Sequence, residues 1–183
     1  MPRILILFGT TDGQTAKIAR TLGEELRTLG AEVDVVRAGA DASASRPEDY
    51  AGIIVAASVH VRRYQQPVRR WLRAHAAGLR GKPTAFLSVC LAVLQKDDEQ
   101  VQRDIQTIIN GLLTATGWQP TIVRKIPGAL LYTRYNWLVR MVMRQIARTQ
   151  GRDTDVTRDY EYTNWDDLRA FAREFHALVE RPA

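Results

Sequence analysis

The stretch ILILFGTTDGQT, residues 4–15, decides the fold of this chain. Its first five residues are a continuous apolar run, typical of a strand that is buried on both faces of a parallel sheet. After Thr15 the period changes, and apolar residues recur at three- and four-residue steps at Ile18, Ala19, Leu22, Leu26 and Leu29. This spacing predicts an amphipathic helix that ends at Gly30. The turn between strand and helix therefore lies at a helix N-terminus.

That turn has the chemistry of an anion-binding loop. The first amides of a helix lack intrahelical acceptors, and the helix dipole is positive at that end. Three threonine hydroxyls add hydrogen-bonding groups, and Gly13 lets an anion approach the backbone closely. The turn lacks the three glycines of the dinucleotide fingerprint and the Gly-Lys-Ser/Thr of the P-loop. Its pattern, hydroxyl-x-x-Gly-x-Thr, resembles the FMN-phosphate loop of flavodoxins; an ordinary strand-to-helix turn is the alternative.

Composition predicts one globular domain over residues 1–183. The chain has 183 residues, 45% of them hydrophobic, which is enough for one core. No uncharged apolar run is long enough to span a membrane and no signal peptide precedes the first strand, so we expect a cytoplasmic protein. Cys90 is the single cysteine and cannot form an internal disulfide. His60, His75 and His176 do not have metal-ligand spacing, so no metal site is predicted.

The positive charge of the chain is concentrated in one region. The formal net charge is +6, and residues 105–152 hold seven Lys or Arg and no Asp or Glu. Such a patch suggests an anionic partner, namely a membrane surface, a carboxylate-bearing substrate or nucleic acid.

Strands and helices alternate along the chain. Further strands are expected at residues 32–37, 53–57, 84–89 and 121–126, and further helices at residues 67–75, 101–116 and 165–179. This alternation predicts an α/β, flavodoxin-like three-layer fold, with a five-stranded parallel sheet of order 2-1-3-4-5 between helices. In such a sheet, a ligand lies beyond the carboxyl ends of the strands.

The loops after the first, third and fourth strands meet at this edge. The flavodoxin resemblance implies that they bind FMN, the first loop at the phosphate and the other two along the isoalloxazine ring. The predicted contacts are Thr10, Thr11, Asp12, Gly13, Gln14, Thr15, Ser58, Val59, His60, Val61, Arg62, Tyr64, Ser88, Val89, Cys90, Leu91 and Ala92. For Tyr64 the alternative is a half-buried surface aromatic, and for Cys90 a small buried hydrophobic residue. Asp12 is unfavourable beside a phosphate unless its carboxylate points outward or caps the helix.

Residues 127–162 form an insert that the minimal fold does not need. Within it, three arginines at four-residue spacing share one face of a predicted helix, and apolar residues cover most of the remainder. We expect this basic amphipathic helix to face substrate or an anionic membrane surface. The residues expected on that face are Arg134, Tyr135, Trp137, Arg140, Arg144 and Arg148. The alternative is a helix packed on the domain with a solvated arginine stripe.

Several short stretches together point to one family. They are Ile6-Leu7-Phe8 with Asp12-Gly13-Gln14-Thr15, Ala57-Ser58, Ala85-Phe86-Leu87-Ser88-Val89, Gly128-Ala129-Leu130 with Tyr132 and Arg134-Tyr135, Gly151, Asp153-Thr154-Asp155, and Tyr162-Thr163-Asn164-Trp165. Through these residues the chain resembles, over its whole length, the flavodoxin-like, menaquinone-dependent protoporphyrinogen oxidases of bacteria.

The resemblance implies FMN-dependent oxidation of protoporphyrinogen IX to protoporphyrin IX in haem synthesis, with electrons passed to a membrane quinone, menaquinone or ubiquinone. It also implies peripheral association with the inner face of the cell membrane, where the insert arginines would meet propionates or lipid phosphates. The sequence identifies no general base and leaves the oligomeric state open, a homo-oligomer included.

Two alternatives are kept, of which the second belongs to another functional class. The first is a generic flavodoxin-like electron-transfer protein or quinone reductase. The second is a flavin-free module that binds nucleic acid or membrane through the basic helix. No recognised nucleic-acid motif supports the second alternative, so no nucleic-acid partner is predicted.

Overall fold

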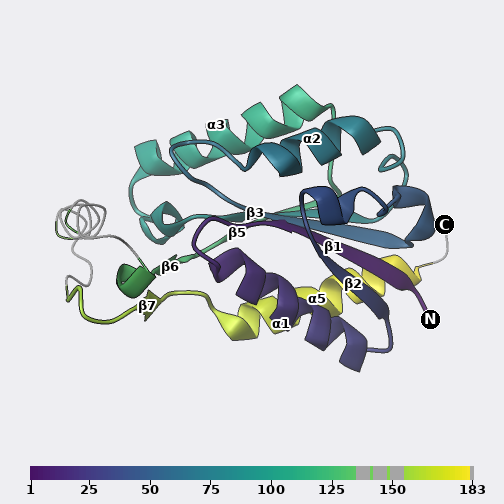
Figure 1. Cartoon of the computed structure of the whole chain (residues 1–183), viewed down its shortest axis with the longest axis horizontal. Helices are drawn as coiled ribbons and strands as arrows, with labels where there is room; N and C mark the ends of the chain where they lie inside the picture. The colour runs from purple at the N-terminus through teal and green to yellow at the C-terminus, as the bar shows by residue number, and fades with distance from the viewer. Residues whose placement is uncertain (135–140, 142–147, 149–154, 182–183) are drawn as a thin grey trace.

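The computed structural model describes residues 1–134, 141, 148 and 155–181. Five strands form one parallel sheet in the order β2-β1-β3-β4-β5, which confirms the predicted fold (Figure 1). The strands are β1 (Arg3–Gly9), β2 (Glu32–Arg37), β3 (Gly52–Ser58), β4 (Thr84–Val89) and β5 (Ile122–Ile126). Their bounds lie within one residue of those expected from the sequence, because the apolar runs that define them are short and sharply ended.

Strand β1 pairs with β2 on one side and β3 on the other. Its side chains alternate between two cores, as the pleat of a strand requires. Ile4 and Ile6 belong to one core and Leu5 and Leu7 to the other, and all four are fully buried. The continuous apolar run at the start of the chain therefore fills both faces of the sheet, as predicted.

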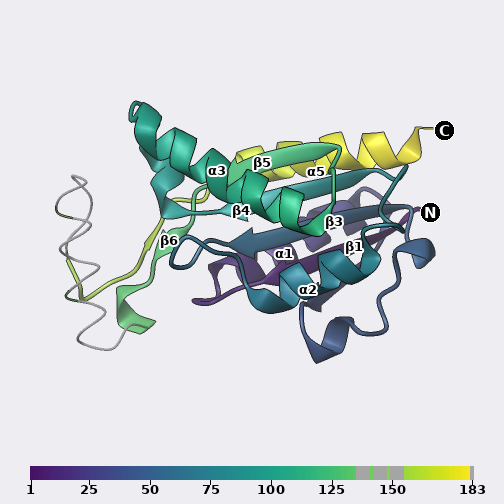
Figure 2. The ribbon, with the colours of Figure 1, turned by 90° about the horizontal axis from the view of Figure 1, so that it is seen from above.

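Helices cover the sheet on both faces (Figures 1 and 2). The helices α1 (Gln14–Thr28) and α5 (Trp165–Glu180) pack on one face, and α2 (Gln66–His75) and α3 (Glu99–Thr116) pack on the other. Helix α3 begins two residues earlier than expected because Asp98 caps it, with Oδ1 accepting from the Val101 amide at 3.1 Å. The loop expected after β2 contains a short 3₁₀ turn at Ala40–Ala42, and a second turn follows at Pro47–Asp49.

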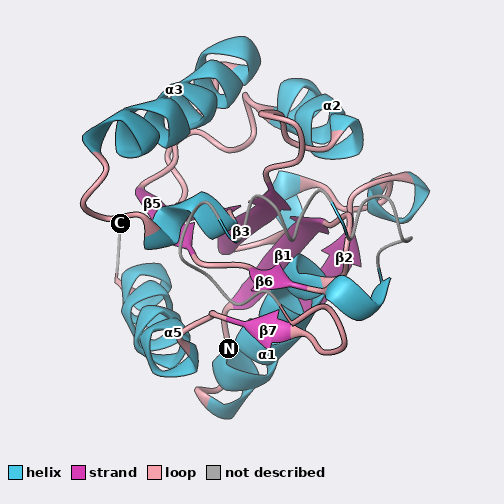
Figure 3. Cartoon of the chain, turned by 90° about the vertical axis from the view of Figure 1, so that its left-hand side faces the viewer, coloured by secondary structure: helices cyan, strands magenta, loops and turns pink. Residues whose placement is uncertain are grey.

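A small antiparallel hairpin was not expected from the sequence. Strands β6 (Ala129–Leu130) and β7 (Tyr160–Glu161) pair with each other, so the two ends of the insert return to the same place. Leu130 and Tyr132 are buried there in a small core of their own. Figure 3 shows the hairpin in front of the main sheet, at the edge where the site is predicted.

The side chain of Asn164 caps α5. Its Oδ1 accepts from the amides of Asp166 at 3.1 Å and Asp167 at 3.2 Å. Asn164→Ala leaves these amides without that acceptor, so we expect a loss of about 1 kcal/mol in the free energy of unfolding, measured by urea denaturation. The matched control is Asn110→Ala on the exposed side of α3, which should change stability by less than about 0.5 kcal/mol. Equal losses in the two variants would contradict a capping role.

Candidate functional site

The first loop joins β1 to α1 through a left-handed glycine. Gly13 has a φ of 98°, and its amide donates to the Thr10 hydroxyl at 2.9 Å. Glycine adopts this conformation without strain, which other residues rarely do. The first helical hydrogen bond runs from the Lys17 amide to the Gly13 carbonyl at 3.1 Å. The amides of residues 14–16 therefore have no intrahelical acceptor and can bind an anion.

Thr15 provides the test of whether this loop fits a phosphate. Its side chain is 1% exposed, and its hydroxyl is buried without a hydrogen-bond partner. Buried hydroxyls are normally paired, so an orphan of this kind calls for a ligand or a water. A hydroxyl donor beside three free amides fits a phosphate monoester without any lysine.

The side chains of Gln14, Asp12 and Thr11 in the first loop point to different surroundings. The Gln14 side chain turns toward the hairpin, where its Nε2 donates to Glu161 Oε1 at 2.5 Å and Thr163 Oγ1 at 2.9 Å. Only its backbone amide is left for an anion. Asp12 and Thr11 line a hollow of about 530 Å³ together with Arg20 and Arg37, among others.

The second loop, after β3, is held in a strained turn. Val61 and Arg62 have φ values of 48° and 58°, as in a type I′ turn, while His60 and Arg63 exchange backbone hydrogen bonds of 2.8 and 3.0 Å. Such a φ is unusual for a β-branched residue and costs on the order of 1–3 kcal/mol. The turn presents Val61 to solvent, 81% exposed.

An ion pair ties this turn to α3. Arg62 Nη1 lies 3.1 Å from Asp104 Oδ2, and this hydrogen bond holds the pKa of Asp104 below its usual range. The lowered pKa keeps Asp104 ionised, and so able to pair with Arg62, at more acidic pH than an ordinary aspartate.

Tyr64 and Ser88 lie beneath the loops rather than at their surface. The Tyr64 hydroxyl and Ser88 Oγ are 2.8 Å apart, and the Tyr64 ring meets Phe86 edge-on at 5.2 Å between centroids. Burial raises the pKa of Tyr64, so the hydroxyl stays protonated. Tyr64 is thus neither an exposed aromatic nor the half-buried surface residue kept as its alternative. It is a core residue that supports the second loop.

The third loop, after β4, is less open than expected. The Cys90 amide donates to the Ile126 carbonyl at 3.0 Å, so this amide is paired within the sheet. The next residues form a 3₁₀ helix at Leu91–Leu94. The Cys90 side chain is half-buried, while Val89 is buried in the core of α1 and α5.

Gln65 joins the first two loops, and the sequence analysis missed it. Its Nε2 donates to Ser58 Oγ at 2.7 Å and to Thr11 Oγ1 at 3.2 Å, while its Oε1 is buried without a partner. A Cβ added at Gly9 would lie 2.5 Å from Val68 Cγ2 and 2.9 Å from that oxygen, so a larger residue there would force α2 or the Gln65 side chain to shift. The only sequence signal is its position between the second loop and α2. Glu161 and Thr163 were missed for a similar reason, since they lie 147 and 149 residues from Gln14.

The predicted basic face falls mostly outside the described residues. Tyr135, Trp137, Arg140 and Arg144 are among the residues not described, and Arg134 ends a 3₁₀ turn at Tyr132–Arg134. Arg148 is exposed, as is Met141 at 60%. Among the described helices, none combines the length and apolar character needed to cross a bilayer.

Comparison with known proteins assigns the family. Residues 5–157 match the flavodoxin domain family. Protoporphyrinogen IX dehydrogenase (quinone) of Escherichia coli strain K12 is 32% identical over 180 residues, covering 98% of each chain. The chain belongs to the flavodoxin domain family and, within it, to the family of the protoporphyrinogen IX dehydrogenases (quinone).

Two further comparisons agree with this assignment. A Leishmania major relative of the same name is 31% identical over 181 residues, which cover 97% of this chain and 76% of that protein. The crystal structure of oxidised flavodoxin 1 from Bacillus cereus superposes with a TM-score of 0.56 at 15% identity, covering 99% of each chain. At that identity the likeness concerns the fold alone.

Replacing Thr15 by valine tests the phosphate loop. The change removes one hydroxyl contact to a charged group, which should weaken FMN binding by about 1.5 to 3 kcal/mol, measured by quenching of flavin fluorescence. The unliganded variant should be no less stable than the parent, because the lost hydroxyl has no partner there. Thr28→Val at the exposed end of α1 is the control and should leave FMN affinity unchanged. An unchanged affinity in Thr15→Val would remove Thr15 from the site.

Proposed function

We propose that the protein is an FMN-dependent dehydrogenase that oxidises protoporphyrinogen IX to protoporphyrin IX and passes the electrons to a membrane quinone, menaquinone or ubiquinone. The observation that carries the proposal is the match, 32% identical and covering 98% of both chains, to a protoporphyrinogen IX dehydrogenase (quinone). The buried, unpartnered hydroxyl of Thr15 at the start of α1 supports the FMN part of the proposal independently of the match.

FMN is the cofactor of this reaction, and the first loop would hold its phosphate. The groups that would bind it are the amides of residues 14–16 and the hydroxyls of Thr10, Thr11 and Thr15. The second loop, through Val59–Arg62, and the third, through Cys90–Ala92, would border the ring. Bound FMN supplies two-electron acceptor chemistry, three rounds of which account for the six electrons removed.

The contribution of the protein to this chemistry is placement. Backbone hydrogen bonds between His60 and Arg63 and the ion pair of Arg62 with Asp104 hold the turn at Val61 and Arg62. Gln65 connects the second loop to Thr11 of the first loop. Loops fixed by such contacts would keep two reactants in register, which lowers the entropic part of the barrier. The exposed Val61 side chain offers apolar contact to a tetrapyrrole or a quinone at the same edge.

Turnover of the named substrate tests the proposal directly. The purified protein should be yellow, and with a menaquinone analogue under anaerobic conditions it should produce porphyrin fluorescence faster than the enzyme-free reaction. Fluorescence no faster than the enzyme-free rate, with FMN bound, would favour a generic flavodoxin-like electron carrier or quinone reductase instead. A protein that takes up no FMN would contradict both.

We also propose that the insert arginines hold the protein reversibly on an anionic membrane surface. Arg134, Arg140, Arg144, Arg148 and Arg152 could each contribute about 1 kcal/mol near anionic lipid, or roughly 3 to 5 kcal/mol together. This attraction is screened within a Debye length of about 8 Å at physiological ionic strength, so attachment should weaken as salt is added.

Charge reversal in the insert tests this membrane role. Arg140, Arg144 and Arg148 changed together to Glu should abolish sedimentation with anionic vesicles and reduce turnover with a membrane-embedded quinone, while FMN binding survives. The control changes three exposed arginines elsewhere, Arg80, Arg173 and Arg181, to Glu, which alters the net charge by the same amount. If the insert variant sediments as the parent does, the arginines are simply a solvated face.

A further inference from the structure

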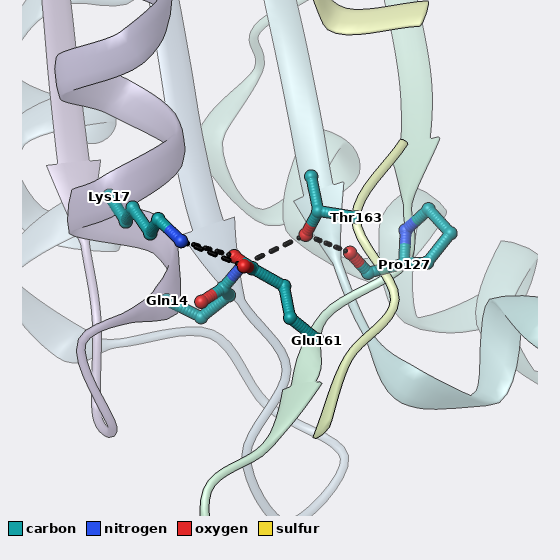
Figure 4. A network of polar contacts seen from close by, with 5 residues as sticks. All are labelled: Gln14, Lys17, Pro127, Glu161 and Thr163. Carbon is teal, nitrogen blue, oxygen red and sulfur yellow. Dashed lines mark hydrogen bonds and ion pairs between the residues drawn. The ribbon is translucent and has the colours of Figure 1, made fainter. Parts of the chain in front are cut away.

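A cluster of polar side chains joins the hairpin to the start of α1 (Figure 4). We call Gln14, Lys17, Glu161 and Thr163 the clasp. Gln14 Nε2 contacts Glu161 Oε1 at 2.5 Å and Thr163 Oγ1 at 2.9 Å, and Lys17 Nζ contacts Glu161 Oε2 at 2.7 Å. Thr163 Oγ1 in turn donates to the Pro127 carbonyl at 2.8 Å. The clasp therefore holds both ends of the insert against one helix.

The buried hydrogen bonds of the clasp matter more for docking of the hairpin than its exposed ion pair. Lys17 and Glu161 are partly exposed, at 55% and 31% of their side-chain surface, and an ion pair of this kind stabilises little by itself. Gln14 and Thr163, in contrast, are only 9% and 7% exposed. Undocking the hairpin would leave the Gln14 amide group without these two partners, which is unfavourable unless water replaces them. Gln14 thus gives the hairpin a buried polar contact to α1, in addition to the packing of its small core against Leu91.

Gln14 is also the first residue of the helix that would bind the phosphate. Its backbone amide and those of the next two residues have no intrahelical acceptor, while its side chain is fixed by residues of the hairpin. Docking of the hairpin therefore restricts the motion of the first turn of α1, which is the turn that would bind the phosphate. A ligand that meets an already ordered site loses less conformational entropy on binding.

We propose that Gln14, Lys17, Glu161 and Thr163 are positioning residues that make docking of the hairpin and binding of FMN mutually favourable. This inference rests on the proposed function, because it requires FMN in the first loop. Lys17 balances the Glu161 carboxylate, which alone would oppose a phosphate dianion at this helix end. Since linkage is reciprocal, FMN must tighten the hairpin by the same factor by which the docked hairpin tightens FMN.

The experiment measures both sides of this linkage. Hydrogen exchange of residues 127–133 and 155–163 is followed with and without saturating FMN, and the Kd of FMN is measured by fluorescence quenching. In the parent, FMN should slow exchange of the hairpin amides about fivefold or more. Thr163→Val removes one of the two acceptors of Gln14 Nε2 and the hydroxyl that donates to the Pro127 carbonyl. In this variant the FMN effect should shrink and the Kd should rise by about the same factor.

A double-mutant cycle separates the clasp from a direct contact between the Gln14 side chain and FMN. Gln14→Met keeps length and neutrality but cannot donate to either partner. If both residues act through the clasp, the double variant should bind FMN no more weakly than the weaker single variant. Additive losses would mean separate effects and would overturn the proposal.

Glu174→Gln is the matched control. It breaks a partly exposed ion pair with Arg124, at 2.6 Å between β5 and α5, that lies outside the clasp. This variant should change neither the Kd nor the exchange of the hairpin. Should Thr163→Val fail to fold, as judged by circular dichroism, Lys17→Met combined with Glu161→Gln cuts the charged arm of the clasp and should raise the Kd in the same direction.

The outcomes distinguish the two levels of inference. If the parent binds FMN but hairpin exchange is unaffected, and Thr163→Val binds FMN as the parent does, the clasp is a structural contact only and the inference is wrong. If the parent binds no FMN, the proposed function itself is wrong and the inference falls with it.

Discussion

The left-handed turn at Gly13 is the constraint on which the functional edge of the molecule depends. Because Gly13 adopts a φ of 98°, α1 starts directly after the loop that follows β1, and three amides are left without intrahelical acceptors. The same turn buries the hydroxyl of Thr15 and directs the side chain of Gln14 to the hairpin. One backbone geometry therefore leaves free the amides that are proposed to bind the phosphate and provides the anchor for the insert.

Different contacts support the loops around this turn. Gln65 connects the first two through side-chain hydrogen bonds, and the second is closed by a backbone pair and the ion pair of Arg62. Below the loops, Tyr64 is buried, with its hydroxyl hydrogen-bonded to Ser88 and its ring packed edge-on against Phe86. Supporting layers of this kind are what precise placement of reactants requires. They suit a protein whose cofactor performs the redox chemistry.

The acidic residues of the insert that the structure describes all have partners. Asp159 accepts from the amide and the hydroxyl of Thr133 at 2.9 and 2.7 Å, and Asp155 accepts from Thr157. Glu161 is paired with Lys17. Residues 105–152 hold seven basic residues and no acid, and one of these, Arg124, pairs with Glu174 of α5. The insert arginines are the ones proposed to meet an anionic membrane surface.

The sequence by itself determined the sheet, its order and the place of the first strand-to-helix loop, because the period of the apolar residues and the start of a helix are local properties. It could not show that Tyr64 is buried against Ser88, nor that Gln65 spans two loops, because both depend on which side chains meet after folding. The hairpin was also hidden, since strands of two residues carry no periodic signal. Only the tertiary structure decided that the Gln14 side chain binds the end of the insert. Its partners Glu161 and Thr163 lie just before α5 in the sequence, and they reach Gln14 because α5 packs beside α1.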